Sequence, residues 1–110
     1  MNWIPLTSVD QLAEIITLSA NKPQVIFKHS TRCSTSSMAL NRLERAETTD
    51  LADFYYLDLL AYRTISAQIA ETFRVEHASP QVILIKNGSC TYDESHMGIN
   101  MDEILEQVNQ

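Results

Sequence analysis

The stretch Lys28–Ser37 combines one cysteine with several hydroxyl and basic side chains, a composition suited to sulfur chemistry. Cys33 follows the apolar run Val25–Phe27, which predicts a buried strand, and precedes Met38–Ala46, which predicts a helix. The first N–H groups of a helix lack intrahelical acceptors, and together with the helix dipole they favour a negative charge. Cys33 is therefore placed to act as a thiolate nucleophile in thiol–disulfide exchange.

The neighbours of Cys33 indicate how its sulfur would react. Arg32 adds a positive charge, and Thr35 and Ser36 supply hydroxyl groups, so we expect these three side chains to stabilise the thiolate. The spacing is Cys33-x-x-Ser36, and a serine cannot resolve a mixed disulfide. A centre with one cysteine would hold a small thiol until another thiol from outside releases it. The alternative, a buried cysteine that behaves as a small apolar side chain, is disfavoured by the polar flanks.

Length and composition limit the possible classes of protein. The 110 residues are enough for one domain, 1–110, with one hydrophobic core. A formal net charge of -6 without a basic stripe argues against a nucleic-acid partner, and the two cysteines and three scattered histidines show no metal-ligand spacing. No apolar run reaches about 18 residues and no basic residue precedes Lys22, so we expect neither a membrane span nor a secretory signal. These features predict a protein of the reducing cytoplasm, where an unusual cysteine is more often catalytic than structural.

Hydrophobic periodicity predicts helices that alternate with strands. Successive apolar residues of Gln24–His29 face opposite sides, so both faces of that strand are predicted to be buried. Strands joined through helices should pair in parallel, whereas strands joined by Asn87-Gly88 must be antiparallel. The sequence therefore predicts an α/β three-layer sandwich, with a mixed four- to five-stranded sheet flanked by helices. The expected strands are Trp3–Leu6 at an edge, Gln24–His29, Phe54–Leu59, Val82–Lys86 and Cys90–Glu94, and the expected helices are Val9 to about Ala20, the segment after Cys33 to about Glu47, Tyr62–Phe73 and one that begins at Asn100.

Local signals mark the ends of these elements. Thr7 or Ser8 can cap the first helix, and Asn100 can cap the last one. Asn87-Gly88 is the strongest hairpin signal in the chain, because a two-residue turn needs positive φ at both positions.

The thiol of Cys90 and the carboxylate of Asp58 could also take part in chemistry, but we favour structural roles for both. Period-two alternation in the returning strand puts Cys90 beside Tyr92, and we expect a structural or incidental role for this thiol. Resolving Cys33 would need the two Cα atoms within about 7 Å, which the topology disfavours. Asp58 can assist proton transfer as a buried acid, although a solvated carboxylate at an edge is the favoured interpretation.

The run Ser79-Pro80-Gln81 precedes the third long strand. A proline at such a position often marks a tight turn and can follow a cis bond. In folds that carry out thiol exchange, such a proline faces the reactive sulfur, and the residue before it pairs with the backbone of a bound peptide. Ser79 and Pro80 are therefore candidate substrate-binding residues, provided that the chain adopts such a fold.

Four segments, Phe27–Cys33, Tyr62–Ser66, Val75–Gln81 and Lys86–Gly88, carry a resemblance that spans nearly the whole chain. The order of elements resembles the thioredoxin/glutaredoxin superfamily with an added first helix, and these segments resemble the monothiol bacilliredoxin family. The resemblance implies a thioredoxin-like fold and an enzyme that removes bacillithiol, its co-substrate, from S-bacillithiolated client proteins. It also implies that Cys33 is the attacking thiol and Pro80 the cis proline opposite it. Ser34 departs from the proline that often follows the cysteine in this family, which can alter the reactivity.

Bacillithiol carries a malate moiety with two carboxylates, so a pocket for it should offer cations and N–H groups. Lys28, His29 and Arg32 are the nearest candidates, with a solvated surface charge as the favoured alternative for each. His29 can instead tune the thiolate or cap its strand. Gly98, before the last helix, can let a ligand approach the backbone closely or can form a plain turn. More distant cations are Arg63, Arg74 and His77.

The leading hypothesis is a monothiol thiol–disulfide oxidoreductase that holds bacillithiol on Cys33. One alternative is a binding module with the same fold and no turnover, because a fold alone does not determine function. Another is a redox sensor, in which oxidation of Cys33 changes the affinity for a partner protein. Only the enzyme requires Cys33 for turnover, and only the sensor requires a partner whose binding depends on the oxidation state.

Overall fold

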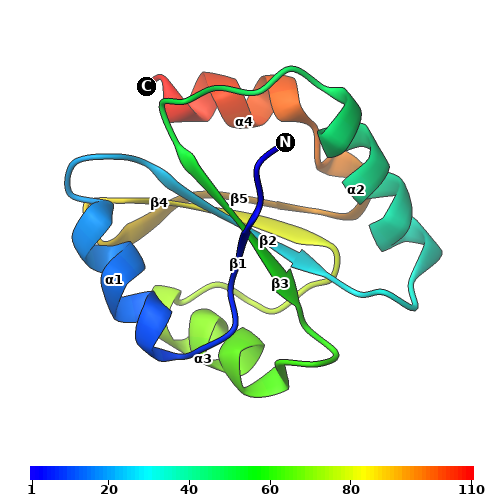
Figure 1. The fold of residues 1–110 in the computed structure, drawn as a ribbon, viewed down its shortest axis with the longest axis horizontal. Helices are drawn as coiled ribbons and strands as arrows, with labels where there is room; N and C mark the ends of the chain where they lie inside the picture. The colour runs from blue at the N-terminus through cyan, green and yellow to red at the C-terminus, as the bar shows by residue number, and fades with distance from the viewer.

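The strand β2 (Gln24–His29) is buried along its whole length and lies at the centre of the sheet. The computed structural model describes residues 1–110, and its five strands follow the order β1-β3-β2-β4-β5, with helices on both faces (Figure 1). None of the helices has the length and apolarity that crossing a membrane requires. The other strands are β1 (Ile4–Pro5), β3 (Asp53–Asp58), β4 (Gln81–Lys86) and β5 (Ser89–Ser95), and the helices are α1 (Asp10–Leu18), α2 (Ser34–Arg45), α3 (Arg63–Phe73), the 3₁₀ turn η1 (His96–Gly98) and α4 (Met101–Val108).

The strand directions follow from the connections between strands. β3 pairs in parallel with both β1 and β2, and β2 and β3 are joined through α2. β4 is antiparallel to both β2 and β5. Asn87 and Gly88 form the tight turn between β4 and β5, with φ values of 50° and 78°. The predicted α/β sandwich, its mixed sheet and the Asn87-Gly88 hairpin are therefore confirmed.

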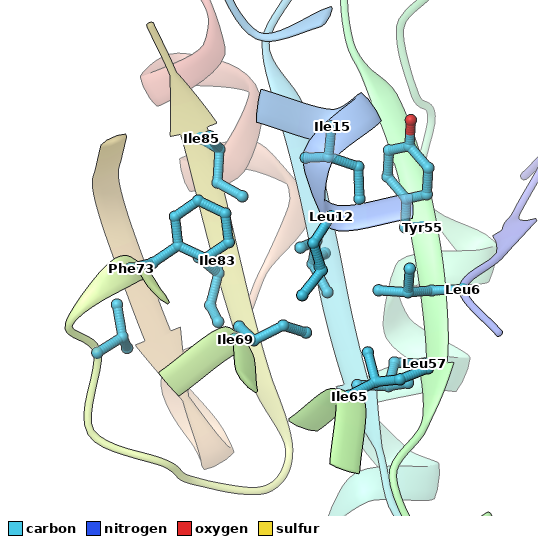
Figure 2. Packing of buried hydrophobic residues seen from close by; sticks show 12 residues of the cluster. Leu6, Leu12, Ile15, Tyr55, Leu57, Ile65, Ile69, Phe73, Ile83 and Ile85 are labelled. Atoms are coloured by element: carbon cyan, nitrogen blue, oxygen red, sulfur yellow. The ribbon is translucent and has the colours of Figure 1, made fainter. Parts of the chain in front are cut away.

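The sheet separates two hydrophobic clusters, each with 12 buried residues. Ile26 belongs to the cluster under α1 and α3, whereas Val25 and Phe27 belong to the cluster under α2 and α4. Figure 2 shows the first cluster, in which side chains of α1 and α3 such as Ile69 meet strand side chains such as Ile83. This packing fixes α2 and α3 on opposite faces of the sheet. Side chains at the end of β2 can therefore contact α2 on one face and α3 on the other.

The predicted cap of the first helix is wrong. α1 begins at Asp10, and the residue before it, Val9, forms no side-chain cap. The side chain of Gln11 instead reaches back, and its Oε1 accepts hydrogen bonds from the backbone N–H groups of Thr7 at 2.7 Å and Ser8 at 3.0 Å. A glutamine near the start of the helix therefore satisfies the donors that precede it, so no Thr or Ser hydroxyl is needed there.

The predicted position of Cys90 beside Tyr92 is also wrong. The register shifts within the β4–β5 pair, so that Ile85 pairs with Cys90 while Leu84 pairs with Tyr92. This β-bulge inserts one extra residue, Thr91, and reverses the alternation that follows it. Cys90 consequently packs against the α1–α3 cluster and Tyr92 against the α2–α4 cluster.

The last helix begins as the sequence predicts. Asn100 precedes α4 in an extended conformation, and its Oδ1 accepts a hydrogen bond from the Glu103 N–H at 2.8 Å. Met101, Ile104 and Val108 then face the sheet at helical spacing and are buried. The cap and the apolar face together hold α4 beside the loop that follows β5.

We expect Asn100→Ala to lower the free energy of unfolding by about 1 kcal/mol, because the Glu103 N–H loses its capping acceptor. Urea denaturation of the full chain measures this change. Asn41→Ala is the matched control, since Asn41 is exposed on α2 and its substitution should be neutral or slightly stabilising. Equal effects of the two substitutions would contradict the capping role.

Candidate active site

Cys33 occupies the residue immediately before α2. Its backbone is extended, with φ -108° and ψ 121°, its side chain is partly exposed, and its thiol is free. The Cys33 N–H donates to the Ser30 carbonyl at 3.2 Å, and the Cys33 carbonyl accepts from the Ser37 N–H at 3.0 Å. The sulfur makes no capping hydrogen bond with the helix. The turn therefore fixes the backbone of Cys33 at the start of the helix and leaves its sulfur free of protein partners.

Ser36 points inward rather than toward the sulfur. It is fully buried, and its Oγ lies 2.7 Å from His29 Nδ1 and accepts the Ser30 N–H at 3.0 Å. A neutral His29 with its proton on Nε2 lets the hydroxyl donate to Nδ1 while it accepts from Ser30. Ser36 thereby links the end of β2 to the first turn of α2, and in this arrangement it supports the Cys33 turn instead of contacting the thiol.

His29 lies in the interior on the α2 side of the sheet. Its ring stacks on Phe27 with centroids 5.7 Å apart and lies 5.5 Å from the ring of Tyr56. Burial lowers the pKa of His29, and the negative charges of Asp58 and Glu44 partly oppose this effect. A neutral imidazole held in this way belongs to the support of the turn and does not lie on a ligand-facing surface.

Lys28 lies on the opposite face of β2, and the interpretation of Lys28 as a solvated surface charge is wrong. Its exposed fraction is 0%, and its Nζ donates to the Ser66 carbonyl at 3.2 Å and lies 3.3 Å from His77 Nδ1. Burial lowers the pKa of Lys28 from 10.5 to about 8. Burial also lowers the pKa of His77, and the charge of Lys28 lowers it further. The sequence could have indicated that Lys28 is buried. In a strand, Lys28 lies on the same face as Ile26, two residues earlier, and that face was predicted to be buried.

The loop before β4 forms the other part of the site. The Ser79–Pro80 peptide bond is cis, and Pro80 is buried. The Pro80 carbonyl accepts the His96 N–H at 3.0 Å, which ties this loop to the start of η1. The Ser79 hydroxyl is buried without a hydrogen-bond partner. A buried hydroxyl without a partner is unusual, and it lies immediately before the cis bond.

The remaining predicted residues lie at the surface of the site. Arg32 is exposed, Thr35 is partly exposed, and neither side chain forms a hydrogen bond within the protein. Gly98 is exposed in η1, but a Cβ atom built on it would lie 2.7 Å from Glu94 Oε1. The space beside Gly98 is therefore occupied by a carboxylate, a residue that the sequence interpretation did not consider.

The second thiol and the nearby acid both have structural partners. Cys90 is partly buried, its Sγ donates to the Tyr92 carbonyl at 3.4 Å, and burial raises the pKa of its thiol. Asp58 Oδ1 accepts the N–H groups of Leu60 and Ala61 and so stabilises the turn between β3 and α3. No group of three or more His, Cys, Asp or Glu side chains is arranged to hold a metal ion. Of the two thiols, Cys33 is therefore the one without a hydrogen-bond partner.

Comparison with known proteins gives the same fold and a family. The family model described as monothiol bacilliredoxin BrxC matches residues 4–104. A solved structure described as a candidate oxidoreductase with a thioredoxin fold is 32% identical, with a TM-score of 0.78, and the match covers 97% of this chain and 93% of that chain. Fasciola hepatica thioredoxin is 18% identical, with a TM-score of 0.74 and coverage of 96% and 95%. Malassezia sympodialis thioredoxin is 20% identical, with a TM-score of 0.73 and coverage of 99% and 90%.

Ser36→Ala should lower the free energy of unfolding by about 1–3 kcal/mol, because a buried Ser30 N–H and the His29 ring each lose a partner. Chemical denaturation measures the loss. Ser37→Ala is the control, since the Ser37 hydroxyl makes no hydrogen bond and its removal should change stability by less than about 0.5 kcal/mol. A Ser36→Ala variant as stable as the control would show that the link is energetically unimportant.

The stability contributed by Lys28 should depend on pH. Its pKa is about 8 in the folded protein and 10.5 when unperturbed, so between these values the unfolded chain binds more protons. Unfolding free energy therefore rises with pH in this window, as the penalty for burying the ammonium disappears. We expect the wild type to gain stability relative to Lys28→Met from about pH 8 to pH 10.5. A difference between the two proteins that stays constant over this range would contradict the burial of a charged lysine.

Proposed function

The chain belongs to the monothiol bacilliredoxin family, and from this premise we propose that it removes bacillithiol from S-bacillithiolated proteins through a mixed disulfide at Cys33. Family and fold identify it as a redox protein of the thioredoxin type. The proposed removal of bacillithiol rests on the Cys33 turn, which presents one free thiol at the start of α2. The other cysteine, Cys90, pairs with Ile85 and so lies toward the Gln24 end of β2, away from Cys33.

The proposed reaction has two balanced exchange steps. The Cys33 thiolate attacks the bacillithiol sulfur of the protein–bacillithiol disulfide, that S–S bond breaks, and the client thiolate leaves and takes up a proton. Cys33 then carries bacillithiol in a new disulfide. The thiolate of a second bacillithiol attacks the bacillithiol sulfur on Cys33 and forms bacillithiol disulfide, and Cys33 returns to its thiolate form. We place this cycle in the reducing cytoplasm, which keeps small thiols available.

The single-thiol mechanism is supported by what surrounds the sulfur. Ser36 carries no thiol and uses its hydroxyl on His29 and Ser30, so it cannot resolve a disulfide at Cys33. Cys90 is engaged on β5, and its raised pKa keeps it protonated, which disfavours it as a resolving nucleophile. A thiol from outside is therefore the reductant that the mechanism requires.

The client protein is proposed to bind at the loop before β4. Ser79 precedes the cis bond, and its buried hydroxyl lacks a partner within the protein. In this proposal Ser79 contacts the client backbone and Pro80 lies opposite the Cys33 sulfur. Arg32 and Thr35, whose side chains have no partner within the protein, stabilise the thiolate and the departing client thiolate.

Cys33→Ser should abolish the release of bacillithiol from an S-bacillithiolated protein in the presence of free bacillithiol, because serine cannot form the mixed disulfide. Mass spectrometry of the client protein over time measures the release. Cys90→Ser is the matched control and should leave the rate unchanged, since Cys90 takes no part in either exchange step. Equal activity of Cys33→Ser and the wild type would refute the mechanism.

A further inference from the structure

A hollow of about 430 Å³ lies along the exposed side of α3. Ser66, Ala67 and Ala70 bring only small side chains to this surface, which leaves space between the helix and its neighbours. The volume falls within the range of small-molecule sites. The residues that line the hollow, called here the α3 groove, are Leu59, Arg63, Ser66, Ala67, Ala70 and His77.

The α3 groove carries positive charge without a protein anion to balance it. Behind its wall, the fully buried Lys28 ammonium is held only by the Ser66 carbonyl and His77, so one of its three N–H groups has no acceptor. Arg63 forms no ion pair; the one ion pair in the structure joins Lys22 and Asp53. A buried ammonium without a counter-charge is costly to the protein, and an anion bound beside it offsets that cost.

The pKa shifts of Lys28 and His77 agree with this geometry. Burial lowers the pKa of Lys28 to about 8, and no carboxylate opposes that shift. The pKa of His77 is lowered by burial and by the Lys28 charge, again with no carboxylate in opposition. By contrast, the pKa of His29 on the other face is partly restored by Asp58 and Glu44. The Lys28 ammonium is therefore a positive charge on the α3 side that no carboxylate compensates.

The opposite side of the site is unfavourable for an anion. Gly98 is the position where a ligand would approach the backbone most closely, but the Glu94 carboxylate fills the space beside it. Glu94 Oε1 also accepts the Ser95 N–H at 2.9 Å, which holds the carboxylate in place. A dianionic ligand entering there would meet a negative charge at contact distance.

The α3 groove is connected to the turn that carries the reactive sulfur. The Leu59 N–H donates to the His29 carbonyl at 3.0 Å, and His29 lies four residues before Cys33. On the other wall, His77 lies two residues before Ser79 and the cis bond. The groove is thus connected through one hydrogen bond to the end of β2 and through two residues of chain to the cis bond.

We propose that the α3 groove is a subsite for a small dicarboxylate, the chemistry carried by the malate end of bacillithiol. Arg63 is its cationic contact, His77 is a hydrogen-bonding group on its wall, and the buried Lys28 ammonium supplies charge from behind that wall. The inference rests on the proposed function for the identity of the ligand. Arg63 can bind a carboxylate with two parallel hydrogen bonds, and the Lys28 ammonium supplies charge from behind the groove. The thiol of the same molecule then extends toward Cys33.

The first test uses the reaction itself. Arg63→Gln should raise the KM for an S-bacillithiolated peptide about tenfold while leaving the rate with the uncharged hydroxyethyl disulfide unchanged, because only the former ligand carries carboxylates. Arg74→Gln is the matched control, since Arg74 lies at the other end of α3 and does not line the groove. A KM for Arg63→Gln equal to that of the control, in an otherwise active enzyme, would overturn the subsite and leave the proposed function intact.

The second test needs no turnover. L-malate added to the wild-type protein should shift the amide resonances of Ser66, Ala67 and His77, whereas the uncharged malamide should not. This result would support the subsite even if the protein failed to act on bacillithiolated clients. Failure of the subsite can therefore be told apart from failure of the proposed function. Shifts confined to the region of Gly98, or no shift with malate, would overturn the proposal.

Discussion

The end of β2 carries the constraint on which the rest of the site depends: two polar side chains at consecutive positions are buried on opposite faces of the sheet. Lys28 extends toward α3 and is held by Ser66 and His77, and His29 extends toward α2 and is held by Ser36. Each buried polar group requires a partner, since leaving one unpaired costs about 1–3 kcal/mol. These partners connect both flanking helices and the segment before the cis bond to the point where the chain turns toward the reactive cysteine.

This arrangement explains how one fold supports single-thiol chemistry. The serine three residues after Cys33 is needed inside the protein, where its hydroxyl links His29 and Ser30, so it contributes to the shape of the turn. The second cysteine lies on a hairpin strand, immediately before the β-bulge at Thr91, and packs against the α1–α3 cluster. The protein therefore has one thiol without a hydrogen-bond partner, and in the proposed mechanism disulfide exchange depends on thiols that arrive from solution.

Most of the fold could be predicted because its signals are local: continuous apolar strands, helical spacing and the Asn87-Gly88 turn. The Cys33 turn was found for the same reason, since a cysteine between a strand and a helix is visible in the sequence. The errors came from contacts between side chains and from register, such as the Gln11 cap and the bulge that moves Cys90 away from Tyr92. No spacing rule shows that Lys28 meets residues from α3 and the following loop, because those partners lie 38 and 49 positions away.

In the proposed mechanism, Cys33 alone forms the mixed disulfide with a small thiol. Intact mass measurement after exposure of the wild-type protein to bacillithiol disulfide, followed by peptide mapping, tests this directly. We expect one bacillithiol adduct per chain, located on Cys33. An adduct on Cys90, or a protein that remains unmodified under conditions where free thiols exchange, would contradict it.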